Sequence, residues 1–379
     1  MSQEIYYDNS ATTKTREESA KLVYEMLTEC YGNPSSLHRK GFEAQKRMDT
    51  AREQIARSLH CQSEEIYFTS GGTEADYLAI LGAARAQKRR GNKIVTTAIE
   101  HDAVLNTVKF LESEGWEIVR LTPDSNGQIT PQQVMEAVDE NTVLFSMMAV
   151  NNEVGSILPV AQVSRMLRKK YPELLIHCDA VQAYCKEPIK LGKNFDVDFL
   201  SVSGHKIYAP KGSGVLYMKK GARFRPVTFG GGQEKNVRPG TEGIANACAM
   251  GLSAELLSQE MEANHQRITQ IRDALLDGLK KLPNICINSP CDATPYILNF
   301  SALGVRSEIM LHFLEEKEIY VSSGSACAKG GASHVLAAMG LDHDRADSAI
   351  RLSFGRYNTM EEVPVFLEAL REGLERFRK

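Results

Sequence analysis

The feature that most constrains the fold is a regular alternation of short apolar runs and helix-like stretches between Ile66 and Tyr217. Each run has the length of a buried strand, and the stretches between them repeat apolar residues with a helical period. This order is typical of an α/β fold, with a largely parallel sheet and helices on both faces. The expected strands are residues 66–69, 93–97, 117–121, 143–147, 174–178, 197–201 and 214–217.

Polar residues recur just after these apolar runs. Gly72, His101, Asn151, Asp179 and Lys206 each follow an expected strand directly or after a short loop. In an open parallel sheet, ligands bind outside the carboxyl ends of the strands. The five positions therefore predict one binding site at a single edge of the sheet.

Lys206 ends the stretch Ser-Val-Ser-Gly-His-Lys, where an expected strand gives way to a glycine-containing loop. A neutral lysine amine forms a Schiff base with an aldehyde, and cationic neighbours together with partial burial lower the amine pKa toward that state. Ser203 and His205 offer hydrogen-bond donors to a phosphate beside it. For this stretch alone, a surface lysine in a turn is an equally good interpretation.

Further residues match what pyridoxal 5′-phosphate (PLP) requires of a protein: a lysine, a carboxylate for the pyridine nitrogen and a cradle for the phosphate. Asp179 follows an apolar strand and supplies the carboxylate. Gly72 and Thr73 open an expected helix, whose free N–H groups suit a phosphate. Gly-Gly-Thr alone is a common turn. The combination of all three groups in one chain predicts PLP as the cofactor.

With these motifs, the stretches Tyr-Asp-Asn-Ser-Ala-Thr-Thr at 7–13 and Ile-Arg-Leu-Ser-Phe-Gly-Arg at 350–356 complete a pattern that spans nearly the whole chain. It resembles cysteine desulfurases of the NifS/IscS type, which are fold-type I PLP enzymes of the class-V aminotransferase family. The resemblance implies a mostly parallel seven-stranded sheet and a smaller α+β domain. We expect a large PLP-binding domain at 15–250 and a small domain formed by 1–14 and 251–379.

The resemblance also implies roles for residues around the cofactor. His101 would stack on the pyridine ring and shuttle protons; the alternative is a helix-start histidine that bonds locally. Asn151 would bind the cofactor or the substrate carboxylate, although turn chemistry alone explains it. Gln182 would donate to the phenolate oxygen. Thr241 would reach the phosphate held by the other subunit of a homodimer; the alternative is a plain helix N-cap.

Substrate binding is expected at two further places. By the resemblance, Asn33 lies near the mouth of the substrate site. Arg351 is the expected partner of the substrate carboxylate, because a guanidinium matches a carboxylate with two hydrogen bonds. Arg356, five residues further along, is a competing candidate.

A small, polar, glycine-rich loop at 322–334 contains Cys327. Such a loop is typically exposed, and Lys329 and His334 would favour the reactive thiolate. Ser-Ser-Gly-Ser-Ala-Cys matches the family motif, which implies that Cys327 takes sulfur from L-cysteine as a persulfide and releases L-alanine. The expected acceptor is an iron–sulfur scaffold protein or a tRNA-thiolation enzyme. The alternative function is a selenocysteine lyase, or another fold-type I lyase or aminotransferase.

Composition excludes several other classes of protein. The net charge of −3 and a pI near 6.3 give no electrostatic footprint for direct nucleic-acid or membrane binding. Because no run reaches the roughly 18 apolar residues of a membrane span and the start is polar, we expect a cytoplasmic protein. Eight cysteines without a Cys-x-x-Cys pair predict no metal site and no disulfide framework.

Overall fold

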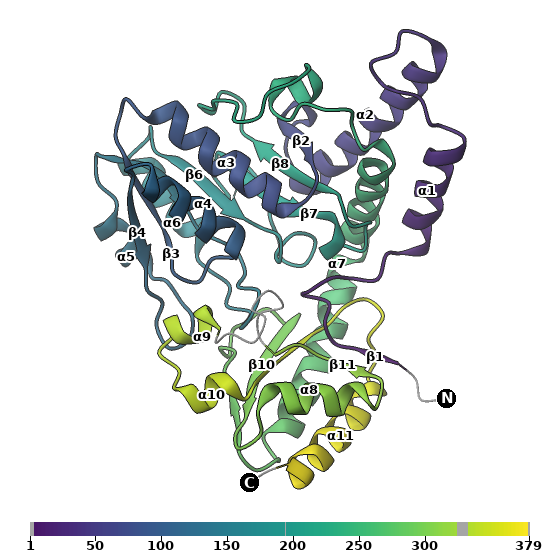
Figure 1. Ribbon diagram of the computed structural model, residues 1–379, viewed down its shortest axis with the longest axis vertical. Coiled ribbons are helices and arrows are strands. Elements are labelled where there is room, and N and C mark those ends of the chain that lie inside the picture. Colours follow the sequence, from purple (N-terminus) through teal and green to yellow (C-terminus); the bar gives the residue numbers. More distant parts are fainter. Residues whose placement is uncertain (1–3, 194, 324–332, 378–379) are drawn as a thin grey trace.

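The computed structural model describes residues 4–193, 195–323 and 333–377. Figure 1 shows a larger lobe built on one sheet and a smaller lobe below it, with α7 (Ile244–Leu279) running from one to the other. The central sheet has seven strands in the order β2-β8-β7-β6-β5-β3-β4. Their bounds are β2 Ile66–Thr69, β3 Lys93–Thr97, β4 Glu117–Leu121, β5 Thr142–Ser146, β6 Leu175–Asp179, β7 Phe199–Ser203 and β8 Gly214–Met218.

The sheet is mostly parallel. β8 runs antiparallel to β2 and β7, and all other neighbours pair in parallel. Every residue of β2, β3, β5, β6 and β7 is buried, as expected for strands that are covered on both faces, whereas the edge strand β4 is partly exposed. The predicted α/β fold with a mostly parallel seven-stranded sheet is confirmed.

Helices cover both faces of the sheet. One apolar core lies between the sheet and two helices, α3 (Gly72–Gln87) and α4 (Asp102–Ser113). The second core, on the other face, contains side chains of α2, α5, α6 and α7 and continues into the smaller lobe. The remaining helices of the larger lobe are α1 Glu17–Thr28, α2 Arg39–Leu59, η1 Ser63–Glu65, α5 Pro131–Ala137, α6 Val160–Lys170, η2 Gly204–Lys206 and η3 Gln233–Asn236.

The smaller lobe combines two small sheets with short helices. β10 (Ile297–Ala302) pairs antiparallel with β9 (Ile285–Ile287) and β12 (Ala349–Ser353), and β1 (Ile5–Tyr6) pairs in parallel with β11 (Ile319–Tyr320). Its helices are α8 Ser307–Glu315, α9 His334–Ala338, α10 His343–Asp347 and α11 Glu362–Phe377. The start of the chain therefore joins the C-terminal strands. α7 crosses residue 250 without a break, so the expected domain boundary stays a prediction.

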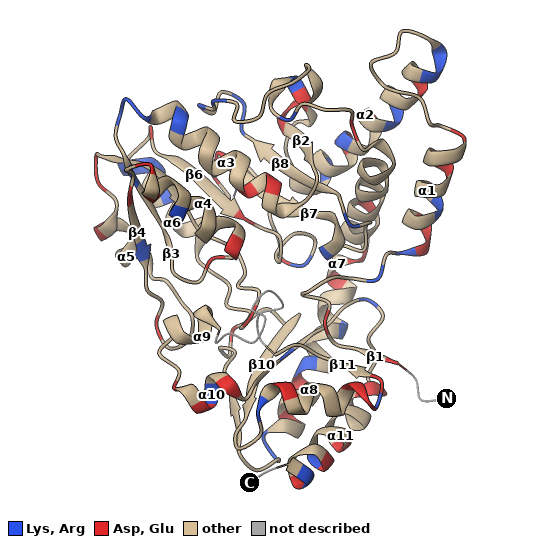
Figure 2. Cartoon of the chain, viewed as in Figure 1, with Lys and Arg blue, Asp and Glu red and all other residues tan. Residues whose placement is uncertain are grey.

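Charged side chains of both signs alternate along the outer helices, and the view in Figure 2 has no large face of one sign. In the described ranges, no helix is both long and apolar enough to cross a membrane.

Candidate active site

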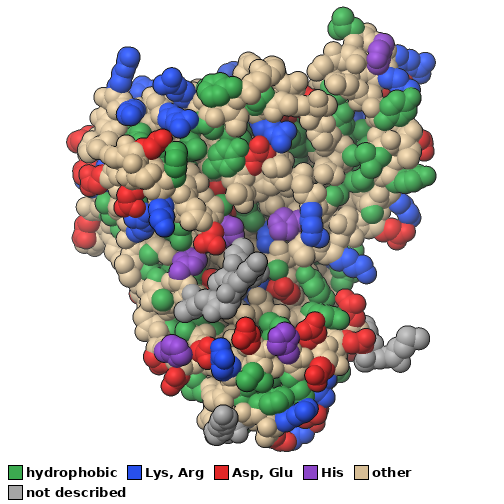
Figure 3. Space-filling view, in the orientation of Figure 1, with side chains coloured by type: hydrophobic (Ala, Val, Ile, Leu, Met, Phe, Trp, Pro, Cys, Tyr) green, Lys and Arg blue, Asp and Glu red, His purple; other side chains and the backbone are tan. Residues whose placement is uncertain are grey.

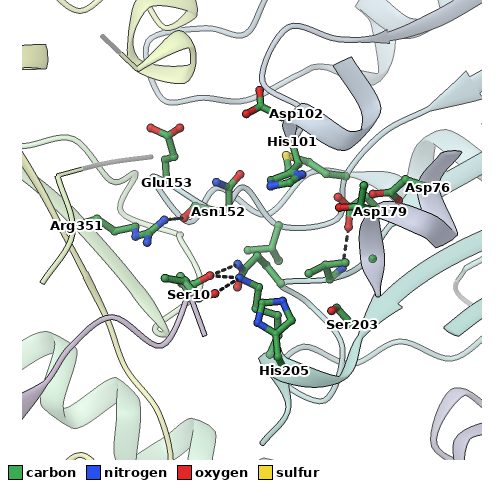
Figure 4. Close-up of a pocket in the computed structure, with 18 of the residues that line it drawn as sticks. Ser10, Asp76, His101, Asp102, Asn152, Glu153, Asp179, Ser203, His205 and Arg351 are labelled. Carbon is green, nitrogen blue, oxygen red and sulfur yellow. Dashed lines mark hydrogen bonds between the residues drawn. The ribbon is translucent and has the colours of Figure 1, made fainter. Parts of the chain in front are cut away.

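A cavity of about 280 Å³ lies where β6 and β7 end, and both lobes contribute to its wall. Figure 4 shows its polar side chains pointing toward one another from several elements. The residues that line it are Ser10, Ala11, Gly72, Thr73, Asp76, His101, Asp102, Met148, Val150, Asn152, Glu153, Asp179, Val181, Gln182, Ser203, His205, Lys206, His334 and Arg351. The carboxyl edge of the sheet is thus where most of the predicted residues meet.

Lys206 lies in η2, directly after the buried strand β7. Its Nζ donates to the backbone oxygens of Ser10 and Ala11, the latter at 2.7 Å. Burial, together with the positive charges of Lys186 and Arg351, lowers the Lys206 pKa to about 7. The amine is therefore neutral in a large fraction of molecules near neutral pH, as a nucleophilic amine must be.

Asp179 is the last residue of β6, and its Oδ1 accepts a 2.9 Å hydrogen bond from the backbone N–H of Val181. Burial raises the pKa of Asp179 to about 7, and the nearby Asp76 carboxyl adds to the rise. A carboxyl group in this environment pairs with a cationic partner at low cost, because the partner's charge favours the ionised form. A protonated ring nitrogen is such a partner.

His101 both caps α4 and faces the cavity. Its Nδ1 accepts from the backbone N–H of Ala103 at 3.1 Å, so Nε2 is the ring nitrogen left for the cavity. Figure 4 shows the ring close to Asp179. The local hydrogen bond that was the alternative to a cofactor role is thus present, and it also fixes the orientation of the ring.

The start of α3 forms a close-fitting turn against the sheet. A Cβ added to Gly72 would lie 2.7 Å from Val181 Cγ2, so only glycine fits there without displacing the turn. The first N–H groups of a helix have no partner within the helix, and Gly72 and Thr73, at this helix start, line the cavity together with Ser203. His205 completes this end: burial lowers its pKa to about 4, and Nδ1 lies 3.2 Å from Thr12 Oγ1.

The two candidate arginines lie in different places. Arg351, in β12, lines the cavity with its side chain 2% exposed, and its guanidinium donates to Asn152 O and Asp8 Oδ1, both at 2.9 Å. Its Nε is buried and has no hydrogen-bond partner in the part of the chain that the structure describes. Arg356 instead contacts Glu260 at 3.4 Å and does not line the cavity. Arg351 is the one placed to meet an anionic ligand.

Three predicted residues lie away from the cavity in this chain. Asn151 is fully buried, and its side-chain amide donates a hydrogen bond to the backbone oxygen of Ile99. Its side-chain oxygen accepts from the backbone N–H groups of Glu153 and Val154, and these contacts fix the turn after β5. Its neighbour Asn152 lines the cavity instead.

Asn33 is exposed in the connection between α1 and α2, and Thr241 is exposed two residues before Gly243, the N-cap of α7. The plain N-cap interpretation of Thr241 is therefore wrong. Cys327, the residue expected to carry the sulfur, falls outside the described residues. Of the residues that flank its segment, Ser322 exchanges two backbone hydrogen bonds with Arg351, at 3.2 and 2.8 Å, and His334 lines the cavity.

Sequence reasoning missed part of the wall. The carbonyls of Ser10 and Ala11 carry no side-chain signal, so nothing in the sequence pointed to them as acceptors for Lys206. Asp76, one helical turn beyond Gly72, had a detectable signal, because residues four apart share a helix face. Glu153 belongs to the polar turn that begins at Asn151, but turn chemistry does not tell which residues of that turn face the cavity.

Comparison with known proteins identifies the family. The class-V aminotransferase model matches residues 5–366. The chain belongs to the class-V aminotransferase family. A cysteine desulfurase IscS from Clostridium botulinum is 39% identical over 376 residues, which is 98% of this chain and 94% of that protein. This match confirms the resemblance to NifS/IscS-type proteins.

Solved structures similar to this chain agree with this assignment. A NifS-like protein has a TM-score of 0.93 and 38% identity, covering 98% of this chain and 100% of its own. SspA, solved in complex with cysteine, has a TM-score of 0.82 and 30% identity, covering 94% of this chain and 100% of its own.

PLP is the cofactor of this family, and the residues of the cavity fit it. The Lys206 amine has a pKa near neutrality, no ion pair of the Asp179 carboxyl is found among the described residues, and the Gly72 turn has no room for a side chain. Among the described residues, Asp76 Oδ1 and Arg351 Nε are buried polar atoms at the wall without a hydrogen-bond partner, although His177 Nε2 lies 3.5 Å from Asp76 Oδ1. Unpaired buried atoms are rare in folded proteins and suit a wall that a polar ligand completes.

Proposed function

We propose that the chain is a PLP-dependent cysteine desulfurase, a sulfurtransferase that converts L-cysteine into L-alanine and leaves the sulfur as a persulfide on Cys327. The observation that carries the proposal is the buried Lys206 amine, which faces one cavity together with Asp179 and Arg351. The high identity to a cysteine desulfurase and the cysteine bound in SspA support this substrate.

When bound, the cofactor withdraws electrons from the substrate Cα, so that the proton there becomes acidic. The chain's own residues then hold and move the reacting groups. Arg351 binds the substrate carboxylate through its guanidinium. Lys206 Nζ takes the Cα proton, since its pKa of about 7 leaves a large fraction of the amine neutral near pH 7. Asp179 holds a positive charge on the cofactor ring, and His101 moves a proton through Nε2.

The sulfur transfer balances without any further reagent. The Cys327 sulfur attacks the substrate sulfur, the substrate Cβ–S bond breaks and an S–S bond forms. The electron pair of the broken bond stays on Cβ, where protonation completes the methyl group of alanine. Cysteine and a thiol thus give alanine and a persulfide. The thiol of Cys327 must be the thiolate to attack.

Incubation of the cofactor-loaded chain with L-cysteine and a thiol reductant tests this function. We expect sulfide and alanine in equal amounts, because the reductant releases the persulfide sulfur as sulfide. Pyruvate and ammonia in place of alanine would indicate a β-eliminating lyase and would contradict the proposal. Cys327→Ala is expected to abolish the sulfide while the cofactor stays bound.

We also propose that two chains form a homodimer. Large hydrophobic side chains are exposed along α1 and the beginning of α2, and Figure 3 shows hydrophobic atoms gathered over this region. These side chains are Tyr24, Leu27, Tyr31, Leu37 and Phe42, exposed by 65% or more of their area. Exposed apolar surface of this extent is typical of protein interfaces. Thr241, exposed in this chain, would reach the phosphate site of the partner, and Asn33 would lie near its substrate mouth.

The acceptor of the persulfide sulfur is proposed to be an iron–sulfur scaffold protein or a tRNA-thiolation enzyme in the cytoplasm. By its resemblance to known desulfurases, the stretch that follows Cys327 looks more like that of enzymes dedicated to one acceptor than like that of enzymes serving the housekeeping scaffold. Transfer of radioactive sulfur from labelled cysteine to each candidate acceptor would distinguish them. Label that stays on the desulfurase with either protein would argue against both.

A further inference from the structure

Lys186 is a buried lysine for which the proposed reaction has no use. Its side chain does not line the substrate cavity, and the residue is only 6% exposed. In the described part of the chain, no carboxylate oxygen lies within 4 Å of its Nζ. Its polar contact is a 3.2 Å hydrogen bond to Gln182 Oε1, and its Nζ lies 5.8 Å from the centre of the Tyr296 ring. Buried lysines without an ion pair are costly and rare.

A short chain of hydrogen bonds connects Lys186 to Lys206. Gln182 accepts from Lys186 through Oε1 and donates through Nε2 to the backbone oxygen of Ser10 at 3.0 Å. The same Ser10 oxygen accepts from Lys206 Nζ. Because an ammonium group only donates, Lys186 fixes which end of the Gln182 amide is oxygen. The N–H end of Gln182 is therefore directed to Ser10 and to the cavity wall.

The two lysines also face one small gap behind the cavity. Lys186, Lys206, Tyr208, Tyr296 and Arg356 all line it, and its volume is about 10 Å³. A gap of this size holds about one water molecule, so water screens the two amino groups very little. A positive charge on Lys186 therefore acts on Lys206 through a poorly screened path.

We propose that Lys186 is a positioning residue for the reactive amine: it orients the Gln182 amide and sets a positive charge behind Lys206, which keeps that amine neutral. The proposal rests on the proposed function for the role of Lys206 as the lysine that binds the cofactor. In this role Lys186 contacts neither the substrate nor the cofactor.

The charges around both amines agree with this role. Lys186 and Arg351 lower the pKa of Lys206 beyond the effect of burial, whereas Asp8 and Asp179 oppose the lowering. Burial lowers the pKa of Lys186 to about 8, opposed by Glu187 and Cys185 and supported by Arg351. Lys186 is therefore still charged in the pH range in which Lys206 titrates.

The test measures the pKa of the Lys206 amine directly. The full-length chain without cofactor is labelled briefly with acetic anhydride between pH 5 and 10, and the Lys206 peptide is quantified by mass spectrometry. We expect an apparent pKa of about 7 in the wild type. In Lys186→Met the value should rise by about one unit, since a like charge that opposed protonation is gone. Lys220→Met, which removes a positive charge from an exposed position, should leave it unchanged.

Lys186→Gln separates charge from hydrogen bonding, because its amide still donates to Gln182 but carries no charge. The Lys206 pKa should rise as in Lys186→Met, while the affinity for PLP should fall only in Lys186→Met. In cofactor-loaded chains, the visible absorption reports protonation of the Lys206 nitrogen bonded to the cofactor, and its pH midpoint should also move upward, because the same positive charge is gone. An unchanged Lys206 pKa in both folded variants would overturn the proposal.

The outcomes separate the two proposals. A chain that desulfurates cysteine but shows no shift at Lys206 would refute only the role of Lys186. A shift at Lys206 in a chain that does not desulfurate cysteine would refute only the proposed function.

Discussion

Arg351 and Arg356 are only five residues apart, but their guanidinium groups contact different partners. Arg351 reaches the cavity from a central position in β12, held by Asp8 and by the backbone of Asn152. Arg356 lies after the strand and pairs with Glu260. From the sequence both were candidates, since either can bind a carboxylate with two hydrogen bonds. What distinguishes the two candidates is that Arg351 lies within β12 and reaches the cavity, whereas Arg356 lies beyond the end of that strand.

We expect Arg351→Lys to raise KM for L-cysteine by roughly 10- to 100-fold, because a hydrogen bond to a charged group contributes about 1.5–3 kcal/mol and lysine cannot make the paired contact. Arg356→Lys is the matched control and should change KM less than twofold. Steady-state kinetics with cysteine measure both. A larger KM effect in the Arg356 variant would reverse the assignment.

At the scale of elements, the strands and the residues after them were predictable because buried parallel strands are short apolar runs with polar residues at their carboxyl ends. Asp179 and Lys206 were found in this way. Helix starts were less predictable. Thr15 to Glu18 forms the sequence pattern of a capping box, yet Arg16 is the N-cap of α1 and makes no side-chain cap. Its side chain is instead buried and paired with Glu18 and Glu260.

The smaller lobe was the hardest part to predict, for a physical reason. β1 and β9 are only two and three residues long, too short for any periodicity to appear. β1 lies beside β11, more than 300 positions further along the chain, and no local pattern contains that pairing. The position of Asn151 was unpredictable in a similar way, since neighbouring residues of a turn point in different directions.

The turn that opens α3 offers a test at this scale. Gly72→Ala is expected to lower the affinity for PLP by about tenfold, since its Cβ would lie 2.7 Å from Val181 Cγ2 and the helix start must move away from the phosphate site. Fluorescence titration of the cofactor-free chain with PLP measures the affinity. Wild-type affinity in this variant would show that the helix start does not form the cradle.

At the scale of the whole molecule, α7 holds the two lobes together. It packs against α1 and α2 in the larger lobe and against α11 in the smaller one. One helix therefore fixes the relative position of the two lobes whose residues line the cavity. The exposed apolar side chains of α1 and α2 lie on the outside of this frame. In the proposed dimer, these side chains would be buried against a second copy, and each Thr241 is proposed to reach its partner's site.

The dimer can be tested with one surface substitution. Leu37→Asp is expected to convert the dimer largely to monomer at micromolar concentration, because burying an unpaired charge in an apolar interface is costly. Phe110→Asp, on the exposed face of α4, is the matched control and should stay dimeric. Sedimentation velocity distinguishes the two states. A wild-type chain that sediments as a monomer would refute the homodimer.

The central claim is that the Lys206 amine carries the cofactor. The most direct measurement is reduction of the PLP-loaded chain with borohydride, followed by proteolysis and mass spectrometry of every lysine-containing peptide. We expect the pyridoxyl phosphate group on Lys206 and on no other lysine, because burial gives this amine a pKa of about 7 beside the Asp179 carboxyl. An unmodified Lys206 in fully loaded protein, or the group on another lysine, would contradict the account.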